Sequence, residues 1–207
     1  MNLFTILSVA VPVITIAPFA GLALRAARNK SGKKKATTEL PRLAARLGLT
    51  FQQSRDFDEV GEIGGAYRGY EVALRPDFFG SMRVTPRGRY PIDLDTKPPT
   101  ERPEEGMTQF TLGHAPFEKY FSQRYAAPQV VQALHGAPLL RDQLVAFCHK
   151  YESKLVNLKV DEYGVVAYVE ETHAYDPELI AVLVDDLVNL TSMLDQSLGH
   201  CHKRDDW

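Results

Sequence analysis

Residues 2–24, NLFTILSVAVPVITIAPFAGLAL, decide how the rest of the chain can be arranged, because they form a long run without a charged side chain. A helix needs about 20 apolar residues to cross the core of a bilayer. Backbone groups in lipid must satisfy their own hydrogen bonds, so a single span has to be helical. Pro12 and Pro18 each remove one backbone donor and predict a kink. We therefore predict a transmembrane anchor over residues 1–24.

Two other interpretations of this stretch are open. A cleaved signal peptide would carry a basic n-region, a shorter apolar core and small residues at the cleavage site. No Lys or Arg precedes the apolar run, and the segment from Pro18 to Ala23 is a poor cleavage site. A buried core helix is the second alternative, and both the length and the terminal position of the run argue against it.

The residues after the apolar run predict its orientation. Six basic residues and no acidic residue precede Glu39: Arg25, Arg28, Lys30, Lys33, Lys34 and Lys35. Because loops rich in Lys and Arg stay in the cytoplasm, we predict a single-pass protein with its N-terminus outside and its soluble domain in the cytoplasm. The same residues are candidates for binding anionic lipid headgroups, although a topology signal alone also explains them.

Length and charge limit the possible domain organisation and partners of the rest of the chain. After a basic linker at 25–38, residues 39–199 are long enough for one domain with a core, and residues 200–207 form a polar tail. The formal net charge of the chain is −2, and the basic cluster lies outside the domain, so the domain itself is acidic. Nucleic acid requires a basic face, so we predict another protein as the partner and no nucleic acid.

The hydrophobic pattern predicts an α+β domain in which a few helices pack on an antiparallel sheet. The first helix begins near Thr38 and ends at Gly48, and the closing helix begins after an Asp176 cap and ends at Gly199. A break at residues 136–138 separates two further helices.

Strands are predicted between these helices. A hairpin turns at Arg68-Gly69, and a later hairpin at 154–170 has a bulge near Val156-Asn157. The remaining predicted strands cover residues 49–52, 81–85 paired with 92–95, 108–112, and the segment FEKYFSQRY (117–125) after Glu118.

One cluster has the composition of a metal site. His200, Cys201 and His202 offer imidazole and thiolate groups, which are good ligands for zinc or copper. Three adjacent residues rarely close a tetrahedral shell, so a solvated tail is the alternative. The glycines of GEIGG (61–65) form neither a phosphate loop nor a dinucleotide fingerprint, and we predict no cofactor.

Acidic and histidine side chains carry weaker signals. Asp185 and Asp186 are adjacent on the closing helix and point about 100° apart, so they do not form a dyad. His114 and His173 follow predicted strands, and neither has a serine or cysteine beside it in a nucleophile motif. Cys148 falls on the apolar side of its helix and is predicted to be core.

An aromatic group is the last candidate surface. Phe117, Tyr120, Phe121 and Tyr125, with Lys119 and Arg124, could line a groove for a peptide or lipid, because aromatic side chains beside Arg are frequent at interfaces. The alternative use of this group is packing in the core of the domain.

From about residue 40 to residue 198 the chain resembles bacterial membrane-anchored proteins to which no activity is assigned. The segments that carry the resemblance are LAARLG (43–48), YRGYEV (67–72) and GHAPFEKYF (113–121), followed by a hairpin and a Leu- and Val-rich helix. The third segment departs from the pattern at His114, Glu118 and Lys119. The resemblance implies a bacterial, membrane-tethered α+β protein and no catalytic residues.

These observations favour a non-catalytic, membrane-tethered module for protein interaction or scaffolding. The alternative is a membrane-bound hydrolase or metal-dependent enzyme, with a site assembled in space from His114, His173 and nearby acids. A third interpretation, a subunit of an assembly, requires a large exposed apolar patch.

Overall fold

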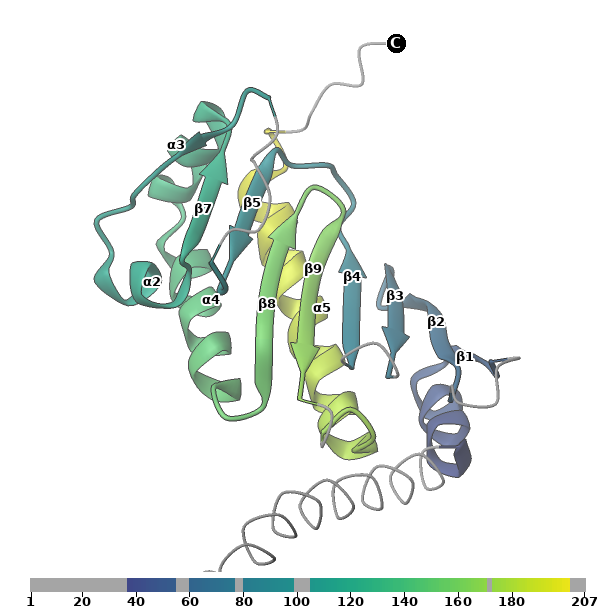
Figure 1. Cartoon of the computed structure of the whole chain (residues 1–207). Helices are drawn as coiled ribbons and strands as arrows, with labels where there is room; N and C mark the ends of the chain where they lie inside the picture. The colour runs from purple at the N-terminus through teal and green to yellow at the C-terminus, as the bar shows by residue number, and fades with distance from the viewer. Residues whose placement is uncertain (1–36, 55–59, 77–79, 99–104, 171–172, 202–207) are drawn as a thin grey trace, which may run out of the picture.

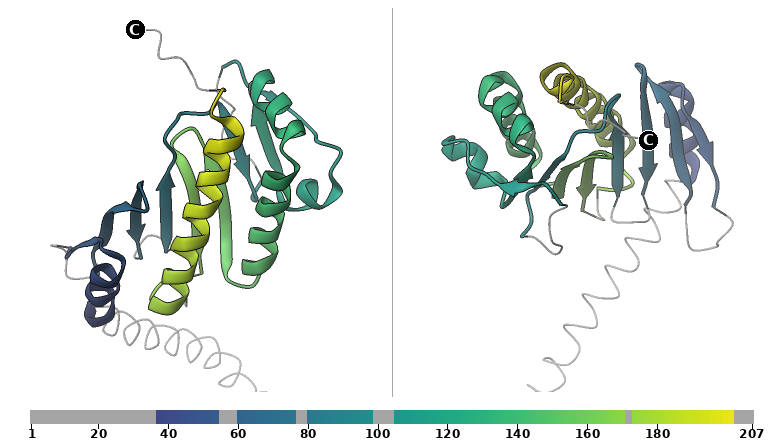
Figure 2. Two further views of the ribbon diagram at one scale, coloured as in Figure 1. Left: turned by 180° about the vertical axis from the view of Figure 1, so that it is seen from behind. Right: turned by 90° about the horizontal axis from the view of Figure 1, so that it is seen from above.

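The computed structural model describes residues 37–54, 60–76, 80–98, 105–170 and 173–201. They form an α+β domain in which helices pack on one face of a single antiparallel sheet, which confirms the predicted fold class for the domain (Figures 1 and 2). The predicted anchor and the basic residues 25–35 lie outside the described residues. Within the described ranges, no helix combines the length and the apolar character that a membrane span needs.

The sheet has nine strands in the order β1-β2-β3-β4-β9-β8-β5-β7-β6, and every pair of neighbours is antiparallel. The strands are β1 (Thr50–Gln52), β2 (Glu62–Tyr67), β3 (Tyr70–Arg75), β4 (Ser81–Thr85), β5 (Ile92–Asp95), β6 (Thr108–Gln109), β7 (Gln123–Ala126), β8 (Leu155–Asp161) and β9 (Gly164–Val169).

The helices lie on one side of this sheet (Figure 2). They are a helix over residues 37–47, α2 (Ala115–Tyr120), α3 (Pro128–Gly136), α4 (Pro138–Tyr151) and α5 (Pro177–Leu198). The predicted cap of α5 is confirmed, because the Asp176 carboxylate accepts the backbone N–H groups of Glu178 and Leu179 at 3.1 and 3.2 Å.

The α5 helix forms the centre of the helical layer. It packs against β4 and β9 and also contacts α3 and α4. Its buried residues are Leu179, Ile180, Leu183, Val184, Leu187, Val188, Leu190, Thr191, Leu194 and Leu198. Burying one leucine or valine side chain contributes about 1.5–3 kcal/mol, so this helix and the strands beneath it supply much of the free energy of folding.

The β2–β3 hairpin has the predicted turn. Arg68 and Gly69 have φ angles of 51° and 80°. A two-residue turn of this kind needs positive φ at both positions, and it matches the twist of the flanking strands. The bulge in β8 is also confirmed, as the register with β9 shifts between Leu155 and Asn157.

The predicted hairpin between residues 81–85 and 92–95 is wrong. Both strands exist as β4 and β5, but β4 pairs with β9 and β5 pairs with β8, so the β8–β9 hairpin lies between them. The connection over residues 86–91 crosses two strands instead of closing a tight turn. Its Arg87 N–H donates to the Asp195 carboxylate on α5, at 3.1 Å to Oδ2, and α5 therefore holds the connection in place.

The segment FEKYFSQRY also differs from its prediction. Residues 115–120 form α2, and β7 begins only at Gln123. Pro116 favours a first helical turn, and the four-residue spacing of Phe117 and Phe121 brings their rings within 4.8 Å between centroids. Both side chains are fully buried, so they belong to the core. The strand predicted at 108–112 is shorter, because Glu118 Oε1 accepts the N–H groups of Leu112 and Gly113.

Gly164 provides a test of this packing. A Cβ at position 164 would lie 2.7 Å from the Val84 carbonyl oxygen on the neighbouring strand β4, and a backbone atom cannot move away without disturbing the sheet. We expect Gly164→Ala to lower the free energy of unfolding by about 1–3 kcal/mol, as measured by urea denaturation.

Gly136→Ala is the matched control, because nothing lies within 4 Å of the Cβ that it adds. The control is expected to leave stability unchanged or slightly raised. Equal losses in the two variants would contradict the close approach of β4 to β9.

Candidate functional site

The face of the sheet opposite the helices, called the open face below, is the candidate functional surface. No helix in the described part of the chain covers it, as Figure 2 shows. Side chains alternate between the two faces of a strand. Val165, Ala167 and Val169 of β9 therefore join the core, whereas Val166 and Tyr168 point to the open face.

The register of the strands places residues of the open face in rows. Arg83 of β4 is paired with Val166 of β9, Val166 with Lys159 of β8, and Lys159 with Asp95 of β5. Val166 is only 2% exposed although it lies outside the core cluster. Its neighbours Arg83 and Lys159 have long aliphatic stems, which cover apolar surface of this kind while their charged ends reach solvent.

An acidic group occupies the β8–β5 half of the open face. Lys159 Nζ lies 3.5 Å from Asp161 Oδ2, and Asp93 and Asp95 are close enough to act on the pKa of the same lysine. Burial lowers the pKa of Lys159, but Asp161, Asp93 and Asp95 outweigh that effect and raise it. Asp161 also accepts the N–H groups of Tyr163 and Gly164, so part of its role is to form the β8–β9 turn.

Asp93 is a carboxylate of this group whose pKa is raised in the folded protein. Burial raises its pKa, while Lys159 and a hydrogen bond from the Gln123 amide act in the opposite direction. Its second oxygen, Oδ1, is buried and has no partner in the described part of the chain. A buried acceptor without a partner is costly, so the ionised form of Asp93 is destabilised in the folded state.

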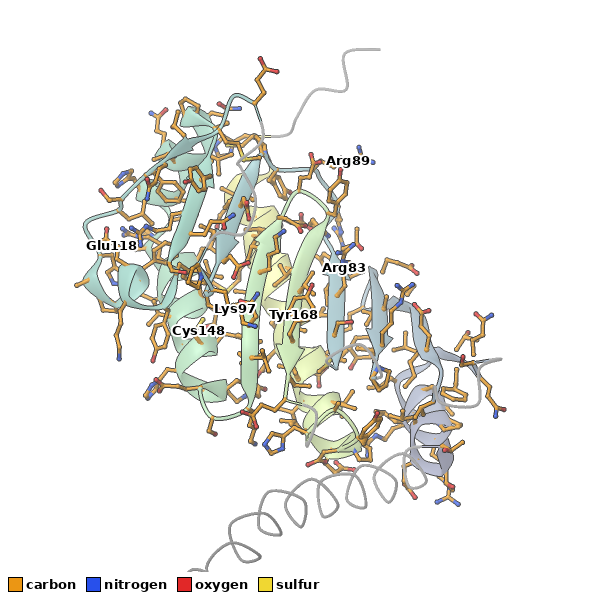
Figure 3. The ribbon with its side chains drawn as sticks, viewed as in Figure 1. Arg83, Arg89, Lys97, Glu118, Cys148 and Tyr168 are labelled. Carbon is orange, nitrogen blue, oxygen red and sulfur yellow. The ribbon has the colours of Figure 1, made fainter. Side chains whose placement is uncertain are left out.

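Arg83 lies on the other half of the open face, and Arg89 lies beyond the end of β4, in the connection to β5 (Figure 3). Ala73, Ser81 and Thr85 are small neighbours of Arg83. Val166 lies opposite it on β9, and Glu71, Arg75 and Tyr168 occupy diagonal positions of the same face. The Cγ of Arg83 would lie 3.3 Å from a Cβ at Gly164, so its stem runs over that glycine. Arg89 follows β4 and places its guanidinium carbon 5.9 Å from the centroid of the Tyr163 ring.

Neither arginine is neutralised by a carboxylate. Arg83 and Arg89 are exposed, and neither forms an ion pair with any of the described residues. Arg75 and Arg68 are also exposed but form ion pairs, with Glu62 at 3.0 Å and with Asp185 at 3.3 Å. Arg87 is exposed and forms none among the described residues, and its guanidinium carbon lies 5.1 Å from the centroid of the Tyr70 ring. Tyr168, which is half-buried, lies on the same face. Arg83, Arg89, Tyr163 and Tyr168 are together called the arginine–tyrosine patch.

A groove lies on the helical side, at the corner between α3 and α4. It encloses about 680 Å³ and is lined by residues that include Gln129, Gln132, Ala133, Pro138, Leu139 and His200. Leu139 is 74% exposed at its rim. Among the lining side chains of the described residues only His200 can carry a charge, so the groove offers mainly apolar contact area and amide groups.

The structure separates Asp185 from Asp186, in agreement with the expected divergence of their side chains. Asp185 accepts the Tyr67 hydroxyl at 2.7 Å, and Asp186 accepts the Tyr151 hydroxyl at 2.6 Å. One carboxylate therefore faces the β2–β3 turn, and the other faces α4. These acids hold α5 in place and do not share a proton as a dyad would.

A third bond of the same kind joins Tyr90 to Asp195 at 2.7 Å. Burial raises the pKa of the Tyr90 hydroxyl, and the hydrogen bond to Asp195 raises it further. The hydroxyl therefore remains a donor throughout the physiological pH range.

The histidines of the enzyme hypothesis lie on different elements. His114 precedes α2, and its Nε2 lies 3.5 Å from Asp142 Oδ1 on α4. His173 lies in the turn before α5 and donates its backbone N–H to Glu170. Within the described residues, no hydrogen bond or ion pair links the two histidines.

The predicted metal cluster is described only in part. His200 is exposed, Cys201 is buried with its Sγ 3.5 Å from the Gln129 carbonyl oxygen, and His202 lies outside the described residues. Burial raises the pKa of the Cys201 thiol, which disfavours the thiolate that zinc binds. Among the residues with assigned positions, no three His, Cys, Asp or Glu side chains gather in a way that could hold a metal. The cluster of three stays a prediction.

The expectation that Cys148 belongs to the core is also tested by the structure. Cys148 is buried in the core, and burial raises the pKa of its thiol to about 12. The arginine–tyrosine patch was not anticipated from the sequence. Its signal was the alternation in SMRVT (81–85) and GVVAYV (164–169), which separates Arg83 and Tyr168 from their apolar neighbours.

The Tyr90–Asp195 bond has a measurable effect on stability. We expect Tyr90→Phe to lower the free energy of unfolding by about 1–2 kcal/mol, because the carboxylate loses a charge-assisted donor in a half-buried site. Chemical denaturation measures this loss. Tyr125→Phe is the control, since its hydroxyl has no partner among the described residues; a comparable loss in that variant would contradict the assignment.

Asp93 predicts a dependence of stability on pH. A carboxyl whose pKa is raised by folding binds its proton more tightly in the folded state, so the free energy of unfolding falls as pH rises through the interval between the two pKa values. We expect Asp93→Asn to be more stable than the unaltered protein at neutral pH, where this penalty is complete. The difference should vanish in acid, where both forms are neutral.

Thermal denaturation across this pH range tests the prediction, with Glu71→Gln, an exposed position on the same face, as the control. A gain in stability that persists in acid would mean that it does not arise from the charge of Asp93.

No protein-family model and no curated protein matches the chain. A solved structure with a similar arrangement is the mycobacterial trehalose monomycolate transport factor A, TtfA. The TM-score is 0.50, the sequence identity is 11%, and the match covers 79% of this chain and 94% of that chain. At this identity the comparison shows that the two proteins share a fold, which is a one-sided antiparallel α+β domain in this chain.

Proposed function

We propose that this chain is a membrane-tethered interaction domain without catalytic activity, which binds another protein through the open face of its sheet. The observation that carries the proposal is the arginine–tyrosine patch. Tyrosine and arginine are enriched among the residues that dominate binding energy at protein interfaces, and here they gather on a face that no described helix covers.

The tether rests on the sequence. Residues 2–24 are long and apolar enough to span a bilayer, and the basic residues that follow favour a cytoplasmic position for the domain. The same basic residues are suited to contact anionic headgroups. A tether raises the effective concentration of a partner at the membrane, so a domain with moderate affinity becomes useful there.

The first described helix attaches firmly to the core of the domain, as a connection to a membrane anchor requires. The helix over residues 37–47, which directly follows the basic segment, buries Leu40, Leu43 and Ala44 in the core. Arg46 of this helix also forms an ion pair with Glu178 at the start of α5, with 3.0 Å between Nη1 and Oε1. The point of entry into the domain is thus packed against the sheet and close to its central helix.

The comparison with TtfA is compatible with an accessory role. That protein is described as a trehalose monomycolate transport factor. We extend to this chain only the general idea of a non-catalytic accessory protein, because the likeness between the two chains is one of fold.

Extraction from membranes tests the tether. We expect the full chain to stay in the membrane pellet after an alkaline carbonate wash, and a C-terminal reporter to be active only in the cytoplasm. A variant with three central apolar residues of the predicted span, Val11, Val13 and Ile14, replaced by arginine should be released into the supernatant, since each arginine costs about 2.5–3.5 kcal/mol there. Release of the unaltered chain would overturn the tether.

Site-specific cross-linking tests the open face. A photo-reactive residue at Thr85, which is exposed on that face, should form adducts with another protein when the full chain is in its native membrane. The control position is Asn189, which is exposed on α5 at the helical side. Equal adducts at the two positions, or none at Thr85, would contradict binding through the open face.

A further inference from the structure

The charges on the open face define what kind of partner fits it. We infer that the arginine–tyrosine patch binds a polypeptide segment that carries carboxylate side chains, an inference that rests on the proposed function. Arg83 contributes a guanidinium to which two carboxylate oxygens can bind side by side, and Arg89 contributes a second one next to an aromatic ring.

The first argument is the absence of an internal partner. Within the described residues, the exposed arginines 42, 46, 68 and 75 each pair with a carboxylate at 3.0–3.3 Å. Arg83, Arg87 and Arg89 are exposed as well and have none in the described part of the chain, and of these Arg87 lies over the Tyr70 ring. Carboxylates from outside can therefore pair with Arg83 and Arg89 without displacing an acid of the same chain.

The second argument is access. Ala73, Ser81 and Thr85 beside Arg83 are small, so an extended segment can approach β4 there, with Glu71, Arg75 and Tyr168 at the diagonal positions. Arg83 itself is supported from below, because its stem runs over Gly164. A supported guanidinium loses less conformational entropy on binding than a freely moving one.

The third argument separates a peptide from other anionic partners. Asp93, Asp95 and Asp161 lie on the same face, two to three strands away from Arg83 in the sheet order. A membrane surface or a nucleic acid presents negative charge over its whole area, and these acids would repel it. A peptide presents separate carboxylates, and these can lie over the arginines. The peptide can leave the acidic half of the face uncovered, or place its own basic residues there.

The tyrosines add the apolar part of the contact. Tyr163 is 51% exposed at the β8–β9 turn, and Tyr168 lies further along the same strand pair (Figure 3). Rigid aromatic rings next to arginine supply contact area at a low cost in entropy. The patch thus combines charge recognition with a surface for the backbone and apolar groups of the segment.

The test uses the full chain in its native membrane with the photo-reactive residue at Thr85. We expect Arg83→Glu with Arg89→Glu to reduce the adduct about tenfold or more, because each carboxylate contact becomes a repulsion. Arg83→Lys with Arg89→Lys should retain part of it. Arg42→Glu with Arg46→Glu is the control for a change in net charge away from the patch and should have no effect on the adduct.

Two further measurements test the electrostatic contact. Adduct formation should fall as the salt concentration rises, and soluble poly-glutamate should compete with the partner whereas poly-lysine should not.

Mass spectrometry of the adduct identifies the partner class. A cross-linked peptide with clustered Asp or Glu supports the inference. An adduct with an uncharged or basic peptide, with lipid or with nucleic acid overturns it, and so does an adduct that the double glutamate variant leaves unchanged. Where the adduct is with an uncharged or basic peptide, the open face still binds a protein, so the proposed function stands although the inference fails. A complete lack of adducts at Thr85 contradicts the proposed function instead.

Circular dichroism and chemical denaturation of the three double variants show whether they fold. Both arginines are exposed and without ion pairs, so their replacement is expected to leave stability nearly unchanged.

Discussion

Burial of α5 against one face of the sheet is the constraint on which the rest of the domain depends. Ten residues of this helix are buried, and the helix contacts β4, β9, α3 and α4. Most apolar side chains of the central strands point toward it, and Val166 on the open face is an exception. Because that one layer supplies the core, the opposite face of the sheet needs no cover for stability, and its residues are free to serve another purpose.

Polar bonds fix the position of α5 within this layer. Three aspartates along the helix accept tyrosine hydroxyls from three separate places: the β2–β3 hairpin, the β4–β5 connection and α4. Hydrophobic contact alone is not directional, so a helix on a smooth apolar surface can slide or rotate. The three hydrogen bonds define one position and one rotation, and they give these acids on a largely buried helix a structural role.

Much of this fold could be predicted from periodicity and caps. Asp176, Pro177 and the leucine spacing after them predict α5, and Arg68-Gly69 predicts the first hairpin, because these signals are local. Strand pairing is not local. The pattern of residues 81–95 contains two strands, but it does not say that a hairpin from residues 155–169 separates them.

The same limit applies to function. The short helix α2 was not predicted, because the spacing of Phe117 and Phe121 is compatible with either a strand or a helix. Their shared contact in the core, which decides between the two, is visible only in the structure. Arg83 and Tyr168 look like ordinary alternating residues of two strands that are far apart in the sequence. Only the pairing of β4 with β9 places them on one face, so no local motif could have indicated the arginine–tyrosine patch.

The insertion of β8 and β9 between β4 and β5 has a consequence for synthesis on the ribosome. When residues 81–95 have emerged, β4 can pair with β3 but not yet with β9, so one edge of β4 stays unpaired until about 70 more residues are made. An exposed edge can pair with another nascent chain. The domain therefore completes its sheet late, after most of the chain has left the exit tunnel, and its yield in the cell depends on protection of that edge during translation.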